Sequence, residues 1–224
     1  MKIVSLNISK EKGTIKSPCK EIEIDSEGIV GDAHRGVWHR QISMLASECI
    51  EQFSREKKEV SYGEFAENIT TKDVPIHQAA ILDRFKIGQE IELEVTQIGK
   101  KCHGHGCAIY TEVGECVMPK EGIFLRVISP GKIKCGDTIE FIKKPLKVKI
   151  ITLSDRAFAG IYKDESGPAI KSSLENFFRD KRWHLEIKNF LISDSMQALQ
   201  NLIRQNDFEM CIRDRAFFAK FFLF

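Results

Sequence analysis

The first part of the chain alternates apolar and polar positions over short runs. Ile22 and Ile24 alternate with glutamates, and residues 91–95 place Ile, Leu and Val on either side of two more glutamates. A period of two is typical of strands that bury one face. Glycine-containing turns separate these runs, and only residues 46–56 and 76–85 have helical spacing. Residues 1–142 are therefore expected to form a mainly β domain, a small closed or sandwiched structure.

The pattern changes after a charged, proline-containing segment, residues 143–147, which we interpret as a linker. Residues 148–153 form a nearly continuous β-branched apolar run, which is typical of a buried parallel strand. A helical pattern, a strand, a second helical pattern and a third strand follow, at 168–180, 185–192, 195–205 and from Phe208. This βαβαβ order predicts that residues 148–224 begin a doubly wound α/β domain.

The end of the chain does not continue this order. Five of the last nine residues are phenylalanine, with no capping residues and no polar face: Phe217, Phe218, Phe221, Phe222 and Phe224. Such a segment would be an exposed apolar patch. We interpret residues 211–224 as a truncation or a sequence artefact, and a segment docked on a partner is the alternative.

Composition narrows the functional classes. Thirty-four Lys and Arg against 32 Asp and Glu give a net charge of +2, so the chain offers no general field for nucleic acid. The first residues lack the apolar core of a signal peptide, and no apolar run approaches the roughly 18 residues that a membrane helix needs. We expect a soluble cytoplasmic protein that binds neither nucleic acid nor membrane, with its seven cysteines as free thiols.

The densest chemical cluster lies at residues 100–107. It holds two thiols, Cys102 and Cys107, two imidazoles, two lysines and two glycines. Nearby positive charge lowers the pKa of a thiol, which favours a nucleophile or a soft-metal ligand. Two alternatives remain: a zinc site that adds His103 and His105, although the spacing is unlike that of structural zinc sites, and unreactive buried cysteines. Blander surroundings are expected for three other cysteines, Cys19, Cys49 and Cys135.

A second polar cluster follows the glycines at 28 and 31. It contains Asp32, His34, Arg35 and Arg40 beside an expected β core. Arginine side chains suit phosphate or carboxylate groups because they bind them through two parallel hydrogen bonds. A polar ligand is one interpretation of the cluster. The alternative is structural, with Asp32 paired to Arg35 or Arg40 as part of the scaffold.

Several ordered motifs over residues 1–142 resemble the MOSC family, β-barrel modules named for the C-terminal domain of molybdenum cofactor sulfurases. The matching stretches are Lys16-Ser17-Pro18, 28–34, Arg40-Gln41-Ile42-Ser43, 66–71, Ile87-Gly88, Thr96-Gln97, 102–107 and 114–124. The family's usual glycine before Glu-Asn-Ile is Ala66 in this chain.

The resemblance implies binding of molybdopterin or the molybdenum cofactor, with molybdenum held at a cysteine, or carriage of the cofactor's sulfur on that cysteine. Cys107 matches the family cysteine best, with Cys102 as the reserve. Lys16, Arg35 and Arg40 are then the cations that face the pterin phosphate. Asp32, His34 and Asn68 complete the expected site. Sulfur-donor proteins or molybdoenzymes are the partners that this role implies, and pyridoxal phosphate binding belongs to the family-level description.

The opening of the second domain resembles the MoaB/Mog family of molybdopterin-binding and adenylylating proteins. The resemblance covers residues 150–168 and 191–194, and it implies cofactor binding by Asp155 and Asp194. Ser166 and Pro168 mark a helix start, where free backbone N–H groups favour an anion. The family's Thr-Thr-Gly-Gly-Thr-Gly loop is absent, so adenylylation is not expected.

Two further functions stay open at this point. One is a Cys/His metal-binding module at 102–107. The other, suggested by relatives of the MOSC type, is a molybdoenzyme that reduces N-hydroxylated compounds with an electron-donor partner.

Overall fold

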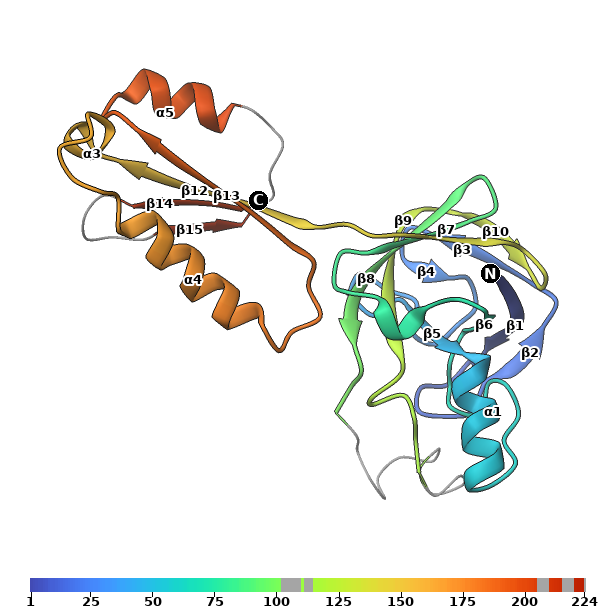
Figure 1. The fold of residues 1–224 in the computed structure, drawn as a ribbon. Coiled ribbons are helices and arrows are strands. Elements are labelled where there is room, and N and C mark those ends of the chain that lie inside the picture. The colour runs from blue at the N-terminus through green and yellow to red at the C-terminus, as the bar shows by residue number, and fades with distance from the viewer. Residues whose placement is uncertain (102–109, 111–114, 205–209, 215–219, 224) are drawn as a thin grey trace. The chain divides into compact units, whose positions relative to one another are not determined.

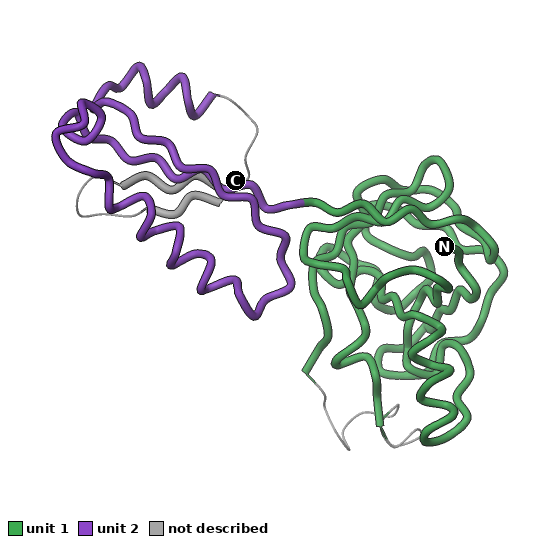
Figure 2. The backbone as a smooth tube through the Cα atoms, in the orientation of Figure 1, with its two compact units in different colours: residues 1–144 green, residues 145–224 purple. Residues whose placement is uncertain are grey.

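The computed structural model describes residues 1–101, 110, 115–204, 210–214 and 220–223. It divides into two compact units, Met1–Lys144 and Pro145–Phe224 (Figure 2). The division lies inside the stretch 143–147 that the sequence marks as a linker. Each unit is described by itself below.

The first unit is built mainly from strands (Figure 1). Its larger sheet has the order β11-β7-β8-β9-β5-β6-β1-β2, and its smaller sheet has the order β10-β3-β4. The strands are β1 (Lys2–Ile8), β2 (Ser17–Cys19), β3 (Glu21–Asp25), β4 (Gly28–Ile29), β5 (Ile42–Ala46), β6 (Ile69–Lys72), β7 (Arg84–Ile87), β8 (Ile91–Ile98), β9 (Ile123–Ser129), β10 (Gly131–Lys134) and β11 (Ile139–Ile142).

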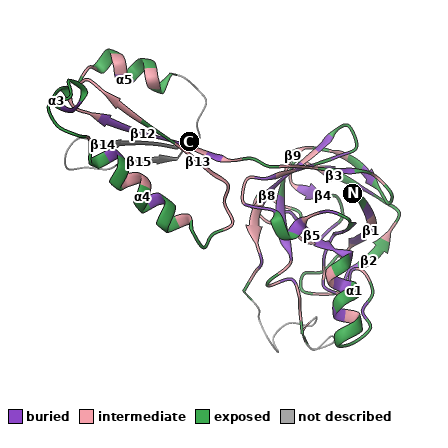
Figure 3. Ribbon diagram, viewed as in Figure 1, coloured by how far each residue is buried: buried purple, intermediate pink, exposed green. Residues whose placement is uncertain are grey.

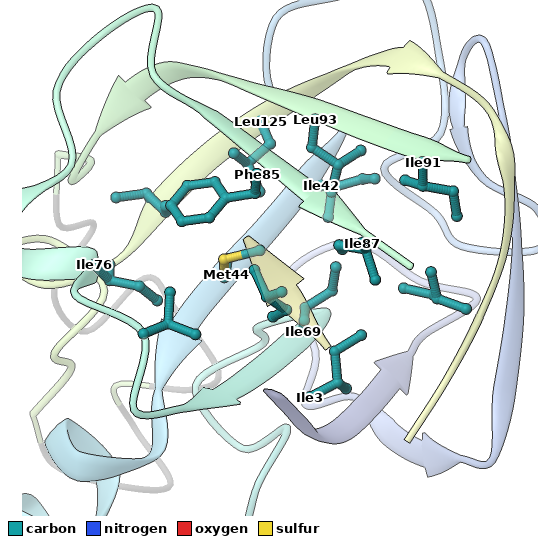
Figure 4. Packing of buried hydrophobic residues seen from close by; sticks show 14 of the residues in the cluster. Ile3, Ile42, Met44, Ile69, Ile76, Phe85, Ile87, Ile91, Leu93 and Leu125 are labelled. Atoms are coloured by element: carbon teal, nitrogen blue, oxygen red, sulfur yellow. The ribbon is translucent and has the colours of Figure 1, made fainter. Parts of the chain in front are cut away.

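Burial follows the alternation seen in the sequence. Strand β3 exposes its glutamates and buries Ile22 and Ile24, whereas every residue of the central strand β5 is buried. Figure 4 shows the core that results, where Met44 and Phe85 meet a set of isoleucines and leucines from the surrounding strands. The exposed and buried faces of the strands are visible in Figure 3. The prediction of a mainly β first domain is confirmed at the level of its elements.

A single long helix of the described first unit, α1 (Ser47–Glu56), covers a second apolar cluster. Its inner face carries Ile50 and Phe53, and Phe53 packs edge-on against Phe65 with ring centroids 5.1 Å apart. Glu48 lies in the first turn and Arg55 in the last, so both charges complement the helix dipole. The sequence predicts this helix correctly.

The expected closed barrel is not found. The larger sheet begins at β11 and ends at β2, and no continuous ladder joins these ends in the described structure. One isolated bridge links Lys2 to Thr138, and the backbone N–H of Ile139 donates to the Met1 carbonyl at 3.2 Å. These contacts bring the start of β11 beside β1. The sheet stays open because β3 and β10 pair with each other in the smaller sheet instead of extending the ladder.

The helix expected at 76–85 is also wrong. Only Ile76–Gln78 form a short 3₁₀ turn, and Arg84 already belongs to β7. Leu82 has a left-handed backbone with φ of 77°, which interrupts a helix. The Asp83 carboxylate accepts from the Ala80 N–H at 2.8 Å and closes a turn instead. Pairing of β7 with β8 and β11 then buries Phe85 on the core.

The second unit contains one four-stranded sheet with the order β13-β12-β14-β15. Its elements are β12 (Leu146–Leu153), α3 (Asp155–Phe158), α4 (Ser166–Phe178), β13 (Leu185–Ile192), α5 (Met196–Ile203), β14 (Met210–Asp214) and β15 (Lys220–Leu223). Strand β12 lies between β13 and β14 and is parallel to both. Figure 1 shows α4 and α5 on opposite faces of this sheet, and Leu199 of α5 packs on Ile151 of β12. The predicted order of strands and helices is present.

The backbone of the phenylalanine-rich end takes part in this sheet. Strand β14 pairs in parallel with β12, and β15 pairs antiparallel with β14. The interpretation of residues 211–224 as an artefact stays a prediction. Among the described residues, no helix is long and apolar enough to cross a membrane.

Candidate functional site

The carboxylate of Asp32 lies fully buried in the first unit, in the loop that follows β4. Its Oδ2 accepts from Lys16 Nζ at 2.5 Å, from the Asn68 amide at 3.0 Å and from the Ser9 N–H at 3.1 Å. Its Oδ1 accepts from the His34 N–H at 2.9 Å. Burial raises the pKa of Asp32, but hydrogen bonds from His34 and Lys16 outweigh burial and hold that pKa below its ordinary value.

Lys16 is committed to this carboxylate. Its side chain is 1% exposed, and burial lowers its pKa while Asp32 acts in the opposite direction. Nζ also lies 3.5 Å from His34 Nδ1. The Lys16 N–H donates to the Gly63 carbonyl at 2.9 Å, and a Cβ on Gly63 would lie 2.3 Å from the Lys16 oxygen. Gly63 therefore has no room for a side chain, and the backbone on both sides of Lys16 is fixed.

Asn68 connects this pair to the larger sheet. Its amide nitrogen donates to the Asn7 carbonyl at 3.1 Å as well as to Asp32. Its carbonyl oxygen accepts from the Ser43 N–H at 3.1 Å and from the Ser43 hydroxyl at 2.9 Å. Strands β1, β5 and the residue before β6 meet at this one amide. Its hydrogen bonds are made within the protein, which gives Asn68 a positioning role.

A second buried carboxyl, Glu67, lies beside Asn68. Its Oε1 accepts from the Gly63 N–H at 2.6 Å and from the Thr70 hydroxyl at 2.9 Å. Its Oε2 is buried and has no hydrogen-bond partner among the described residues. Burial raises the pKa of Glu67, against the lowering effect of the bond from Gly63. The protonated form is thus favoured relative to a carboxyl in water.

Trp38 joins the Asp32 loop to a second cation. Its indole N–H donates to the His34 carbonyl at 2.7 Å, and the indole stacks on the His34 imidazole with ring centroids 6.3 Å apart. The Arg40 guanidinium lies 4.8 Å from the Trp38 ring centroid and 5.7 Å from that of Phe124. Arg40 Nε is buried and has no hydrogen-bond partner in the described part of the chain. Lys12 Nζ lies 5.8 Å from the Trp38 ring and adds positive charge.

Arg35 turns to a different set of partners. It donates to Asp25 through Nε at 2.8 Å and pairs with Glu27 at 2.7 Å, at a half-exposed surface position. The structural alternative in which Asp32 pairs with Arg35 or Arg40 is therefore wrong, because Lys16 and His34 occupy both oxygens of Asp32. Of the three cations assigned to a phosphate, only Arg40 lacks an acidic partner within the described ranges.

The candidate thiols Cys102 and Cys107 lie outside the described residues. The three cysteines taken as bland differ among themselves. Burial raises the pKa of Cys49 to about 11 and also raises that of Cys19, which lowers the thiolate fraction of both at neutral pH. Cys135 is exposed, so the prediction of a sheltered setting is wrong for this residue. No group of three or more His, Cys, Asp or Glu that could hold a metal is found among the described residues.

The two aspartates proposed in the second unit lie together at the carboxyl ends of β12 and β13. Asp155 Oδ1 accepts from the Asp194 N–H at 2.9 Å. They border a cavity of about 640 Å³. Asp164 accepts from the N–H groups of Ser166 and Gly167 at 3.1 and 3.2 Å. The expectation of free N–H groups at this helix start is therefore wrong, because a carboxylate of the chain already caps them.

Six residues of the first unit are expected in one site from the sequence, and the structure brings four of them into contact: Lys16, Asp32, His34 and Asn68. Arg35 and Arg40 have other partners, which are Asp25 and Glu27 for Arg35 and the Trp38 ring for Arg40. The contacts that Trp38, Glu67 and Ser43 make with this site are not predicted from the sequence. A tryptophan close to two cations in a glycine-bounded loop is a signal for cation–π contacts. Glu67 and Ser43 give no comparable signal, because their burial depends on how β5 and β6 pair.

Comparison with known families and structures agrees with part of this picture. Residues 31–140 match the family model described as MOSC domain. A search of curated proteins returned no match. Over that range the chain is therefore similar to the MOSC domain family.

Solved structures share the fold at low sequence identity. The YUAD protein from Bacillus subtilis is 19% identical with a TM-score of 0.54, over 64% of this chain and 96% of that one. YiiM from Escherichia coli is 16% identical with a TM-score of 0.50, over 92% of both chains. YiiM from Geobacillus stearothermophilus is 16% identical with a TM-score of 0.52, over 91% of this chain and 97% of that one.

The buried ion pair leads to a stability prediction. Asp32→Asn leaves the Lys16 ammonium buried without its counter-ion, so we expect a loss of roughly 3–5 kcal/mol in the free energy of unfolding. Asp25→Asn is the matched control, since it removes a half-exposed partner of Arg35 and should cost at most about 1 kcal/mol. Urea unfolding followed by circular dichroism measures both.

Because folding lowers the pKa of Asp32, the stabilisation that its carboxylate provides is complete above about pH 4 and declines as pH falls further. Equal small losses in the Asp32→Asn and Asp25→Asn variants would contradict a stabilising role for the buried Asp32–Lys16 pair.

Glu67 has the opposite pH dependence. Folding raises its pKa, so its carboxyl favours the folded state below its unfolded pKa, about 4.3, and this contribution is lost as pH rises through the folded value. Glu67→Gln keeps an acceptor for Gly63 and Thr70 and cannot ionise. We expect the variant to gain stability relative to the wild type with rising pH, and to show little gain at pH 4. Unfolding curves at several pH values test this. A difference that is constant with pH would refute it.

Proposed function

We propose that the first unit binds molybdopterin or the molybdenum cofactor as an anion, with Arg40 as the principal phosphate ligand. MOSC domains are associated with the molybdenum cofactor, and residues 31–140 match the model of that family. The observation that carries the proposal is the buried Arg40 Nε, which lacks a partner among the described residues. An unsatisfied buried donor costs about 1–3 kcal/mol, and an anionic oxygen of a ligand would remove that cost.

The residues around Arg40 fit an anionic, ring-containing ligand. The Lys16 charge is matched by Asp32 and the Arg35 charge by Asp25 and Glu27. Further positive charge is supplied by Arg40, by Lys12 and by Lys100, which lies close enough to Lys16 to lower its pKa. Trp38 keeps the Arg40 guanidinium in place by a cation–π contact. A guanidinium held in this way loses little freedom when it binds a phosphate oxygen.

The buried network has a positioning role in this proposal. Asp32 fixes the loop that leads to Trp38, and the His34 carbonyl holds the indole N–H. Cys107 remains the thiol that the resemblance assigns to molybdenum or sulfur, with Cys102 in reserve. The cofactor, when bound, would supply molybdenum for group transfer. A sulfur-carrying role would require a sulfur-donor protein and a molybdoenzyme acceptor as partners.

The second unit does not fit the same ligand by itself. Its cavity is lined by four carboxylates and two cations, Asp155, Asp164, Glu165, Asp194, Arg156 and Lys163. This excess of negative charge disfavours a phosphate. We therefore place the anion site in the first unit, and assign no step to the MoaB/Mog-like resemblance.

Titration with molybdopterin released from cofactor extracts tests the role of Arg40, with pterin fluorescence as the signal. Arg40→Ala should weaken binding by about 10- to 100-fold, the range expected for a charged hydrogen bond. Arg35→Ala is the control, because it removes the same charge from a guanidinium that Asp25 and Glu27 already occupy. The wild-type affinity should fall with added salt. Equal losses in both variants, or no binding by the wild type, would refute the proposal.

Reactivity of the thiols tests the role of Cys107. Iodoacetamide labelling near neutral pH, followed by peptide mapping, should modify Cys107 or Cys102 well before Cys49, whose pKa is raised to about 11. Cys135 is exposed and is not a suitable control. If neither Cys107 nor Cys102 is labelled faster than Cys49 in folded protein, the proposal of an activated thiol is contradicted. Stoichiometric zinc that protects Cys102 and Cys107 together would instead favour the metal-binding alternative.

A further inference from the structure

Two cysteines far apart in the sequence lie side by side in the first unit. Cys19 ends β2, and Cys135 follows β10 directly. Strand β10 pairs with β3 so that Lys134 lies opposite Glu21, and continuing this register places Cys135 opposite Lys20, the neighbour of Cys19. The Cys135 N–H donates to the Lys20 carbonyl at 3.2 Å, which confirms that the two segments are in contact there.

The Cys135 side chain also reaches the backbone of Cys19. Cys135 Sγ lies 3.8 Å from the Cys19 carbonyl oxygen, and Cys19 Sγ lies 3.4 Å from the Leu6 carbonyl oxygen. Cys19 is the neighbour of the residue opposed to Cys135, and it lies where the chain passes from the larger sheet to the smaller one. Disulfides span Cα distances of about 4.4–6.8 Å. To bond to Cys135, the Cys19 side chain would have to rotate away from the Leu6 carbonyl.

The two thiols differ in access. Cys135 is exposed, whereas Cys19 is partly buried and packs against the main core. Burial raises the pKa of Cys19, and the nearby Cys135 charge raises it further. Cys135 is therefore the thiol that a dissolved oxidant reaches first, and Cys19 is placed to react with the product.

We propose that Cys19 and Cys135 form a redox modification site whose oxidant is a hydroperoxide. The Cys135 thiolate attacks one peroxide oxygen, the O–O bond breaks, and Cys135 becomes a sulfenic acid while the leaving oxygen takes a proton. Cys19 sulfur then attacks the sulfenic sulfur, the S–O bond breaks, and water leaves with the Cys19 proton. Two thiols lose two electrons and two protons in total, and hydrogen peroxide is reduced to two waters.

The bond would add a covalent link between parts of the unit that share hydrogen bonds and core packing. It would tie β2, at one end of the larger sheet, to the segment after β10 of the smaller sheet, across 116 residues of sequence. Closing so long a loop restricts the unfolded chain, so the oxidised protein should melt at a higher temperature. This inference is independent of the proposed cofactor site.

The experiment treats the reduced full-length chain with hydrogen peroxide, blocks the remaining thiols, and maps peptides without reduction. We expect a peptide pair linked through Cys19 and Cys135, which a thiol reductant separates again. Cys19→Ser and Cys135→Ser should each abolish this pair, and Cys49→Ser, the matched control, should retain it. The melting temperature should rise on oxidation in the wild type and in Cys49→Ser only.

Mapping of the wild-type chain decides the matter even where a serine variant fails to fold. The proposal is overturned if Cys19 stays a free thiol while Cys135 is oxidised. It is equally overturned if Cys135 is found linked to another cysteine or to Cys135 of a second molecule, which a dilution series distinguishes from an internal bond.

Discussion

The first unit depends on one buried ion pair, between Asp32 and Lys16. A carboxylate and an ammonium are both costly to remove from water, and their attraction offsets that cost only where further hydrogen bonds satisfy the remaining atoms. Asp32 meets this condition because Ser9, Asn68 and His34 also donate to it. The end of β1, the approach to β2, the approach to β6 and the loop after β4 are thereby fixed at one point.

This pairing decides where positive charge remains for a ligand. Asp32 neutralises Lys16, and Asp25 and Glu27 bind Arg35. Of these three cations, Arg40, beside Trp38, is therefore the one without an acidic partner among the described residues. The three cations that the resemblance assigns to a phosphate therefore separate into two that carboxylates hold, Lys16 and Arg35, and a partly buried one, Arg40.

Sequence patterns predicted the elements better than the contacts between them. Alternation identified β3 and β8, and helical spacing identified α1, because those signals are local. The helix expected at 76–85 failed because Leu82 takes a left-handed backbone and Asp83 closes a turn, which spacing alone does not reveal. The partner of Asp32 was also missed. Lys16 is 16 residues away, and the strand register that brings it to Asp32 is a property of the whole sheet.

The two buried carboxyls near Lys16, Glu67 and Asp32, have pKa values shifted in opposite directions. Glu67 lies close enough to Lys16 to affect the Lys16 pKa, and a second ionised carboxylate there would compete with Asp32 for the same ammonium. Burial raises the pKa of Glu67, whereas hydrogen bonds hold that of Asp32 below its ordinary value, so Asp32 ionises at a lower pH than Glu67. Asp32, which contacts Lys16 directly, is therefore the carboxylate matched to the buried ammonium. This balance lets a polar cluster lie beside an apolar core without leaving an unpaired charge inside the protein.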